Sequence, residues 1–539
     1  MKRMTYATSS DERHGVRLAA VVLMAAVGAL AAETPFGHEN FLPSPEHAVG
    51  FRGDWTGRYP GATPPLHWST TNSVAWKAEV GSGEASPVVV GDKVFILTDG
   101  NRVTCLKRTD GAVVWQRDRH LRESVPEEAA VFKVEEYVVR YHRLRSASGR
   151  LRDLESQTNR LRREPKQTAA ASNELAALEK GLEACRIEYA SLEAAVREVA
   201  DGSNTLSRSG QPNRYMSRSP VTYAIATPCS DGKRLYVWLP MGAVVAYDLG
   251  GKREWCRVLG DQRYGGGWWG AHVAPSPLLV DGKLVIHYDQ IYCLDAATGK
   301  TLWIQKQRLL SIPSPVPGRR NGAWYVGLGT LQILRLSDGK YVHGDEVGGH
   351  HDCVGVGSPI SFDGIFCWTS HAVEAPDAPE GKGRLLWGLD GETAGRMTQF
   401  NHVQRPETGK PYILRGMGWH GYGSPVEEDG VIYYQHENRI FSAIEAKTGK
   451  LVCAEKSFFR DAKGKEWSVG GGVYPSLTMA GWYLFASGDG GTLVIRTGKE
   501  EAFRPVAFNT LGPSGGSMLV FAGRDMFIHA GPNLYCVRE

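Results

Sequence analysis

The sequence predicts an all-β protein, a β-propeller of eight four-stranded blades with one helical insertion, and two observations lead to this fold class. The 539 residues include 64 Gly, 28 Pro, 15 Trp and 21 Tyr, a composition typical of short strands joined by tight turns. A short phrase, "DAATGKTLW" at residues 295–303, also recurs along the chain in related forms. Repetition of this kind indicates one large repeat architecture.

The repeated phrase joins a turn glycine to a Trp or to a residue that replaces it. Its copies are "TDGAVVW" at 109–115, "GGKREW" at 250–255, "TGKTLW" at 298–303, "DGKYVH" at 338–343 and "TGKLVC" at 448–453. From Gly251 onward the turn glycines are 40 to 58 residues apart, which is the period of a four-stranded blade. Glycine accepts a positive φ in a tight turn, and the Trp is expected to cover the apolar layer between blades. We therefore interpret the phrase as a structural joint.

Ser-Pro, Pro-Ser or similar pairs predict where the blades begin, near residues 86, 227, 275, 313, 358, 424, 475 and 513. The last blade stops after three strands at the end of the chain. Its missing outer strand is expected to be "SVAWKAEV" at 73–80, because Trp76 matches the Trp of the repeated phrase. A ring closed in this way leaves no open strand edge.

Residues 120–202 interrupt the strand pattern between the first and second blades. In this segment Leu175, Leu178, Leu182, Cys185 and later apolar residues follow steps of three and four, as in a heptad seam. A similar preceding segment and a Pro-containing break predict an antiparallel coiled-coil hairpin. Its Arg and Glu residues are expected to be solvated, and with 62 basic against 58 acidic residues the chain has no basic stripe for nucleic acid.

The first residues resemble a secretory signal. Lys2, Arg3, Arg13 and Arg17 precede about fifteen apolar residues that end in small ones, which predicts a signal peptide over residues 1–32. An uncleaved anchor is the alternative. The mature chain is expected to be exported to the periplasm or secreted by a bacterium, without a transmembrane segment. It would comprise the closing strand and first blade at 33–119, the hairpin at 120–202 and the remaining blades at 203–539.

The nine cysteines predict few disulfides. Cys105, Cys293 and Cys536 occupy the same third-strand position, where a small buried residue is expected. No C-x-x-C motif occurs, and nine is an odd number, so at least one thiol is free. A disulfide stays open among Cys229, Cys256, Cys353, Cys367 and Cys453.

Four loops that lead into inner strands are rich in Gly, Trp and His. They read "YGGGWWGAH" at 264–272, "GGHHDCVGVGS" at 348–358, "GMGWHGYGS" at 416–424 and "SVGGGVYPS" at 468–476. In a propeller such loops surround one mouth of the central channel. The predicted ligand site comprises Trp268, Trp269, His272, His350, His351, Asp352, Trp419, His420 and Tyr422. The alternative is that these loops only plug the channel. No metal site is predicted, because adjacent side chains in an extended loop diverge.

Repeats such as "CLDAATGKTLW" resemble those of the pyrroloquinoline quinone (PQQ)-like eight-bladed propellers, and the resemblance covers nearly all of residues 50–539 apart from the insertion. This family includes quinone-dependent dehydrogenases and scaffold propellers of outer-membrane assembly. The dehydrogenases carry an adjacent cysteine pair near the quinone, calcium ligands and an Asp base. This chain has no Cys-Cys pair, and Asp352 is only the best-placed candidate for the base.

The resulting hypothesis is an exported binding or scaffold propeller that uses the channel mouth and the hairpin, on one face, to bind a protein partner or a small molecule. The alternative is a PQQ-dependent oxidoreductase of the alcohol or sugar dehydrogenase type, with PQQ and calcium as cofactors.

Overall fold

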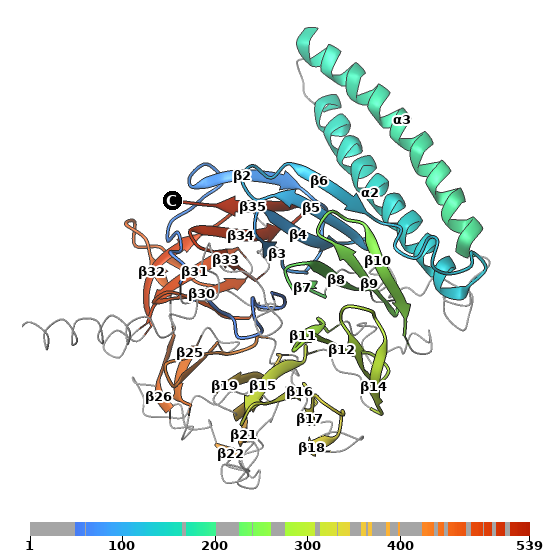
Figure 1. Ribbon diagram of the computed structural model, residues 1–539. Helices are drawn as coiled ribbons and strands as arrows, with labels where there is room; N and C mark the ends of the chain where they lie inside the picture. Colours follow the sequence, from blue (N-terminus) through green and yellow to red (C-terminus); the bar gives the residue numbers. More distant parts are fainter. Residues whose placement is uncertain are drawn as a thin grey trace, which may run out of the picture.

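The fold is seen in a computed structural model. It describes residues 49–539 apart from 60, 164–168, 201–225, 240, 260–274, 308–312, 331, 345–356, 363–364, 369–383, 389–396, 399–422, 436–439, 447–450, 457, 470–475, 489, 498–502 and 512–517. Antiparallel sheets surround a central axis, with their inner strands nearest to it (Figure 1). The prediction of an all-β propeller that carries a helical hairpin is confirmed.

Each sheet follows the chain from an inner to an outer strand. The first four sheets are β3 (Val88–Val90), β4 (Lys93–Thr98), β5 (Arg102–Lys107) and β6 (Val113–Arg117); β7 (Cys229–Ser230), β8 (Arg234–Leu239), β9 (Ala243–Asp248) and β10 (Arg253–Val258); β11 (Leu278–Val280), β12 (Lys283–His287), β13 (Ile291–Asp295) and β14 (Thr301–Gln305); and β15 (Val316–Arg320), β16 (Ala323–Gly327), β17 (Ile333–Arg335) and β18 (Tyr341–His343).

The later sheets repeat this order. They are β19 (Ile360–Phe362), β20 (Ile365–Trp368), β21 (Arg384–Gly388) and β22 (Met397–Thr398); β23 (Val426–Glu428), β24 (Val431–Gln435), β25 (Ile440–Glu445) and β26 (Leu451–Lys456); and β29 (Thr478–Ala480), β30 (Tyr483–Gly488), β31 (Gly491–Arg496) and β32 (Arg504–Asn509), to which β1 (Arg58–Tyr59) adds a parallel strand. A small hairpin joins β27 (Phe459–Arg460) to β28 (Glu466–Trp467).

The ring closes between the two ends of the chain. β33 (Val520–Ala522), β34 (Asp525–Ala530) and β35 (Asn533–Val537) form three strands of the last sheet, and β2 (Val74–Glu79) pairs antiparallel with β35 as the fourth. Trp76 lies opposite Cys536, just as Trp115 lies opposite Cys105. The prediction that the N-terminal strand completes the last sheet is confirmed.

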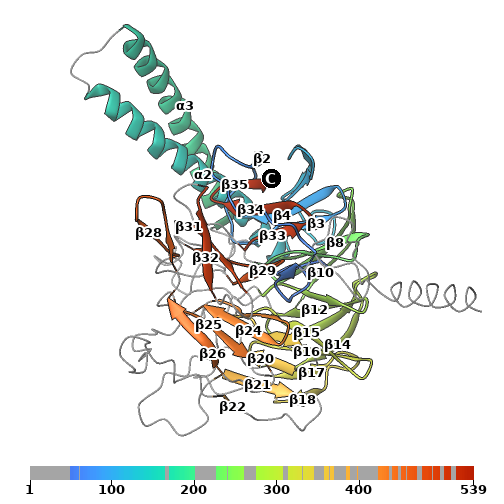
Figure 2. The same ribbon diagram turned by 90° about the vertical axis from the view of Figure 1, so that its left-hand side faces the viewer.

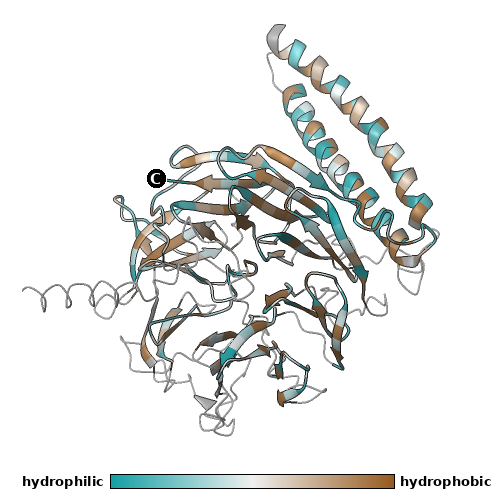
Figure 3. Ribbon diagram, viewed as in Figure 1, coloured by the Kyte–Doolittle hydropathy of each residue, from teal (hydrophilic) through white to brown (hydrophobic). Residues whose placement is uncertain are grey.

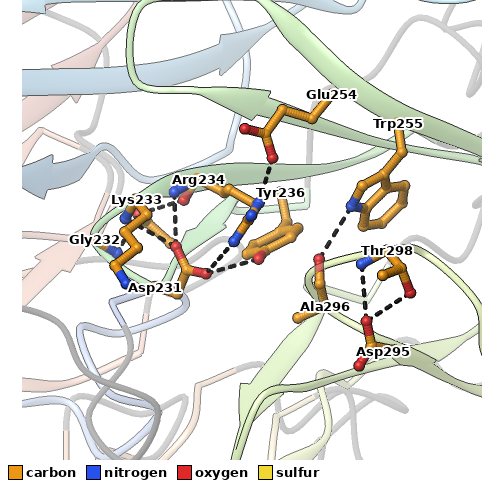
Figure 4. Close-up of polar contacts among 11 residues, drawn as sticks. Asp231, Gly232, Lys233, Arg234, Tyr236, Glu254, Trp255, Asp295, Ala296 and Thr298 are labelled. Carbon is orange, nitrogen blue, oxygen red and sulfur yellow. Dashed lines mark hydrogen bonds and ion pairs between the residues drawn. The ribbon is translucent and has the colours of Figure 1, made fainter.

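The repeated phrase is a joint between neighbouring sheets. The indole N–H of each Trp donates to a backbone carbonyl of the next sheet at 2.8–3.2 Å, in the pairs Trp76–Arg108, Trp115–Leu249, Trp255–Ala296 and Trp303–Leu336. Figure 4 shows the third pair, beside the turn that Asp295 and Thr298 stabilise. The indole also lies flat on the turn glycine: a Cβ at Gly299, where φ is +68°, would stand 2.7 Å from the Trp255 ring. The turn therefore needs glycine for both its φ and its contact.

A second joint runs along the inner rim. The residues two positions before the inner strands donate their backbone N–H to the hydroxyl of the next such residue, at 2.8–3.1 Å, through Ser86, Thr227, Ser276, Ser314, Ser358, Ser424 and Ser476. We call this chain of bonds the hydroxyl belt. In the last sheet the corresponding position is Met518, so the hydroxyl side chains end there.

The insertion forms two helices, α2 (Ala130–Arg162) and α3 (Ala169–Ala200), which project from the ring (Figures 1 and 2). Ion pairs connect Arg162 to Glu179 and Arg150 to Glu188 at 2.7 and 2.6 Å, so the helices run antiparallel. Leu161, Leu182, Cys185 and Val196 are buried between them. In the described part of the chain, no helix combines the length and the apolar character needed to cross a membrane.

The interior is apolar along the inner strands, while the outer strands and the hairpin mix polar and apolar residues (Figure 3). Cys105, Cys293 and Cys536 are fully buried, as predicted for small core residues. The eight described cysteines are free thiols, and Cys353 lies outside the described residues.

Candidate functional site

The ligand site predicted from the sequence lies in loops outside the described residues. This applies to all of its members: Trp268, Trp269, His272, His350, His351, Asp352, Trp419, His420 and Tyr422. Their side chains are therefore not placed here. What is described is the inner rim of the ring, together with the base of the hairpin.

The channel is occupied by the chain's own residues 49–59, which we call the channel segment. At one end Val49 exchanges two backbone hydrogen bonds with Ser230 at the end of β7. At the other end β1 pairs in parallel with β29, placing Arg58 beside Met479 and Tyr59 beside Ala480. These contacts lie on different inner strands, so the segment crosses the ring from one sheet to another.

Arg52 is the central residue of the channel segment. Its side chain is only 2% exposed, and Nη2 donates to the carbonyl oxygens of Pro425 at 2.6 Å and Leu477 at 2.9 Å. These carbonyls follow directly after the belt residues Ser424 and Ser476. Arg52 therefore lies at the level of the hydroxyl belt, next to Ser424 and Ser476, which are the last residues of the Gly-rich sequences at 416–424 and 468–476.

The backbone around Arg52 has an unusual conformation. Arg52 and Trp55 have positive φ values of +53° and +70°, and Gly53 and Gly57 have +83° and +79°. Non-glycine residues adopt this region rarely and at a cost of about 1–3 kcal/mol each, and such strain is concentrated at functional sites. A Cβ at Gly57 would collide with the Arg52 guanidinium. The segment is thus shaped around one side chain.

Three donor nitrogens of the segment have no acceptor. Nε and Nη1 of Arg52, and Nε1 of Trp55, are buried without a hydrogen-bond partner. Burial lowers the pKa of Arg52 to about 10, which still leaves the guanidinium charged at neutral pH. The nearby Asp54 carboxylate is engaged by Thr56, whose N–H donates to it at 3.1 Å. Burial raises the pKa of Asp54.

The base of the hairpin is a second buried polar group. The Glu135 carboxylate on α2 accepts the backbone N–H of His120 at 2.6 Å and that of Leu121 at 3.0 Å. The His120 ring bonds to the Tyr247 hydroxyl at 2.8 Å and to the carbonyl of Asn101. His120 and Glu135 are both fully buried. One buried network therefore joins α2 to the first and second sheets.

Burial shifts both titrating groups of this network toward their neutral forms. It lowers the pKa of His120 to about 4 and raises the pKa of Glu135 to about 7, although the N–H donors of His120 and Leu121 oppose the second shift. Apolar contacts surround the network, with Val131, Val134 and Val138 of α2 in the main core cluster. The base of the hairpin is therefore part of the hydrophobic core.

The hairpin lies on the face of the turns that join second strands to third strands. His142 packs against Gly100 and the His120 ring bonds to Asn101, both in the turn between β4 and β5. The sequence-based expectation was that the hairpin shares a face with the Gly-rich loops. The contacts of the hairpin with this turn are consistent with that face. The expectation itself is not tested, because His350 and Trp419 lie outside the described residues.

The free donors of the channel segment cannot act as calcium ligands. Calcium requires oxygen ligands, whereas Arg52 and Trp55 present only N–H donors. Nowhere in the described residues do three or more His, Cys, Asp or Glu side chains gather as a possible metal site. The chemistry that these donors support is the binding of an anion.

Sequence reasoning missed Arg52, since "FRGDWTGRY" at 51–59 belongs to no repeat. Its only signal is a pair of glycines around Arg and Trp ahead of the closing strand. His120 and Glu135, at the base of the hairpin, were also missed. Both lie within the insertion at 120–202, and neither belongs to the heptad pattern or to the blade repeat.

Comparisons with known proteins agree with this architecture. A family model described as outer membrane protein assembly factor BamB, built on PQQ-like repeats, matches residues 61–345. The chain is similar to BamB from Moraxella catarrhalis, at 12% identity over 57% of this chain and 83% of that one, with a TM-score of 0.39. It is also similar to the quinohemoprotein alcohol dehydrogenase ADHIIG from Pseudomonas putida HK5, at 12% identity over 90% and 76% of the two chains, with a TM-score of 0.43. No curated protein matches. The match spans more than half of the chain, which therefore belongs to the PQQ-like propeller family whose model is described as the outer membrane assembly factor BamB.

Proposed function

We propose that this chain is an exported scaffold propeller that binds a protein partner in the bacterial envelope through its hairpin and the channel-mouth face. The family description, an outer membrane protein assembly factor, supports a role in protein assembly. The alternative is a PQQ-dependent oxidoreductase. The free donors of Arg52 and Trp55 are not calcium ligands, and the residues predicted at the channel mouth lie outside the described residues.

The observation that carries the proposal is the way the hairpin is attached. A helix of 33 residues is about 50 Å long, and only its first turns pack on the ring. The buried network of His120, Glu135 and Tyr247 fixes this base. We call α2 and α3 together the arm. A long arm that is fixed to the ring only at its base can present a surface to a partner, whereas it adds few contacts that stabilise the ring.

The arm also differs in charge between its helices. α2 carries eight Lys or Arg against four Asp or Glu, and α3 carries three against six. Ion pairs such as Arg140–Glu198 use part of this charge between the helices, and the rest faces water. On α3, Ile187 is 65% exposed among alanines. A partner would meet an acidic helix with an apolar centre beside a basic helix.

A photo-crosslinking experiment tests the proposal. A photoreactive residue at Ile187 should capture a discrete partner in envelopes of the native bacterium, whereas the same residue at Leu302, exposed to 46% on the outer strand β14, should not. A His120→Ala, Glu135→Ala variant that undocks the arm should lose the capture. Equal labelling at both positions, or labelling that ignores the docking, would exclude the arm as the binding element.

Further features belong to the same proposal. We propose a signal peptide at 1–32, the domain limits 33–119, 120–202 and 203–539, and coiled-coil packing of α2 on α3. A ring of eight blades is supported by the division of the long strands into sheets of four. The Trp and His residues of the Gly-rich loops are proposed to line the channel mouth. Adding PQQ and calcium to the purified chain should give no stoichiometric quinone absorbance, and a tight complex would favour the oxidoreductase.

A further inference from the structure

We propose that Arg52 anchors a binding site in the central channel for a small molecule that carries an oxyanion group, a carboxylate or a phosphate. This inference rests on the proposed use of the channel-mouth face and names the ligand chemistry of that face. It stands on three observations: the unmatched donors of Arg52, the strained backbone that holds it, and its position at the inner rim of the ring.

The first observation is the count of donors. A guanidinium has five N–H groups, and the structure gives acceptors only to Nη2, which binds the carbonyls of Pro425 and Leu477. Nε and Nη1 have none, and the nearby indole N–H of Trp55 has none either. No carboxylate of the described residues lies within ion-pair distance of Arg52. The guanidinium is therefore held by carbonyls, and the Asp54 carboxylate acts on its charge without forming an ion pair.

Such an arrangement is unfavourable unless an acceptor completes it. A buried ion without a partner costs several kcal/mol, and the most effective partner for a guanidinium is a planar or tetrahedral oxyanion that accepts two parallel bonds. The retained charge is best explained by an anion that enters the channel.

The second observation is the backbone conformation of the channel segment, which holds the Arg52 side chain in place. Four of the six residues from Arg52 to Gly57 have positive φ, and Gly57 leaves the space that the guanidinium occupies. Strain of this kind persists where the surrounding structure requires one conformation. It fixes the guanidinium in advance, so that binding an anion does not require Arg52 to be ordered again.

The third observation is position. Arg52 reaches the carbonyls that directly follow Ser424 and Ser476, at the inner rim. The site lies inside the ring of inner strands, which a folded partner cannot enter. Because Nε and Nη1 are not in contact with solvent, the ligand has to displace the groups that now cover them, and binding should be coupled to a rearrangement at the rim.

Thermal unfolding of the purified full chain with malonate or inorganic phosphate tests this inference, with sodium chloride at matched ionic strength as reference. Malonate, phosphate or both should raise the wild-type Tm by about 1–3 °C at saturation. The compound that raises it identifies the oxyanion as a carboxylate or a phosphate. Arg52→Met should abolish the rise. Arg58→Met removes a cation from the same segment, paired with Glu428 at the surface, and should keep it.

Calorimetric titration of Arg52→Lys covers the case in which Arg52→Met does not fold. Lysine keeps the charge but cannot hold both carbonyls and the ligand, so affinity should fall at least about tenfold. No oxyanion-specific rise in the wild type, or an equal rise in the Arg52 variants, would mean an adventitious ion only and would overturn the inference. If an Arg52 variant loses the oxyanion-induced rise in Tm but still crosslinks at Ile187, the anion site and the partner-binding function of the arm are separate.

Discussion

The two arcs of the ring are held together differently. From the sheet closed by β2 to the β15–β18 sheet, each joint uses a buried or half-buried Trp, namely Trp76, Trp115, Trp255 and Trp303. Beyond it the same position, recognised by the bulge in the outer pair, holds His343, Cys453 and Ala507. The family match at residues 61–345 coincides with the first arc.

The second arc has ties of another kind. Arg52 binds the carbonyls of the residues just before two of its inner strands, β23 and β29, and β1 pairs with β29. Between the β29–β32 sheet and the closing sheet, where a Trp joint is missing, Tyr59 packs edge-on against Phe521 and Trp68 stacks on Phe485. The comparison teaches that the N-terminal residues do for the second arc what the Trp joints do for the first.

The largest effect is expected from deleting residues 33–80. This removes β2, the channel segment and the fillers Tyr59 and Trp68 together, and it leaves β35 as an open edge. We expect an aggregating or unfolded chain in size-exclusion chromatography and circular dichroism. Replacing residues 122–200 by a Gly-Ser linker is the control, and it should lose the helical signal while the strand signal persists. A deletion of 33–80 that melts like the full chain would contradict the closure.

A single Trp should matter much more in the first arc than its counterpart does in the second. Trp115→Ala removes a ring that is 7% exposed and its bond to Leu249, and should cost about 3–5 kcal/mol of unfolding free energy. Cys453→Ala, at the same position of the β23–β26 sheet, should cost less than about 1 kcal/mol. Urea unfolding compares them. Similar losses in both would mean that the arcs do not differ as proposed.

The buried network at the base of the hairpin should make stability depend on pH in two opposite senses. His120 has a pKa of about 4 because burial favours its neutral form, against about 6.5 in the unfolded chain. Its contribution is therefore complete above pH 6.5 and is lost as the pH falls toward 4, by up to about 3 kcal/mol. Glu135, with a pKa raised to about 7, contributes in the opposite sense, and its part is lost as the pH rises from about 4.5 through 7.

Chemical denaturation across pH 4 to 8 measures these two terms. In His120→Asn only the Glu135 term is left, so stability should fall as the pH rises from 4.5 to 7. In Glu135→Gln only the His120 term is left, so stability should fall as the pH drops from 6.5 to 4. A stability profile that neither variant changes would show that the base network is not the titrating element.

The smallest expected effect separates the two roles of a turn glycine. Gly299 and Gly282 have nearly the same φ, +68° and +66°, but only Gly299 has a Trp ring where a Cβ would be placed. Gly282→Ala should cost about 1 kcal/mol for its φ alone, and Gly299→Ala about 1–2 kcal/mol more for the contact with Trp255. Equal losses in thermal unfolding would show that the Trp joint tolerates the extra methyl group.

Much of the fold could be predicted because the repeat is local. The turn glycine, the Trp and the pair before each inner strand lie within one blade, so strands and joints follow from short patterns, as does the pairing of Trp76 with the last sheet. The channel segment could not be predicted, because Arg52 meets Pro425 and Leu477 more than 370 residues away and shares no pattern with them. The joint at His120 depends likewise on a carboxylate of the insertion meeting a turn of the first sheet.

Hydrogen exchange of the full chain, followed by mass spectrometry, tests the central claim most directly, namely that residues 49–59 cross the ring and tie its second arc. The account predicts that peptides covering Val49–Tyr59 exchange as slowly as the inner strand β29, and that Arg52→Met raises exchange in β23 and β29 before it affects β3. Exchange of the channel segment at the rate of an unstructured chain, with β23 and β29 fully protected, would contradict it.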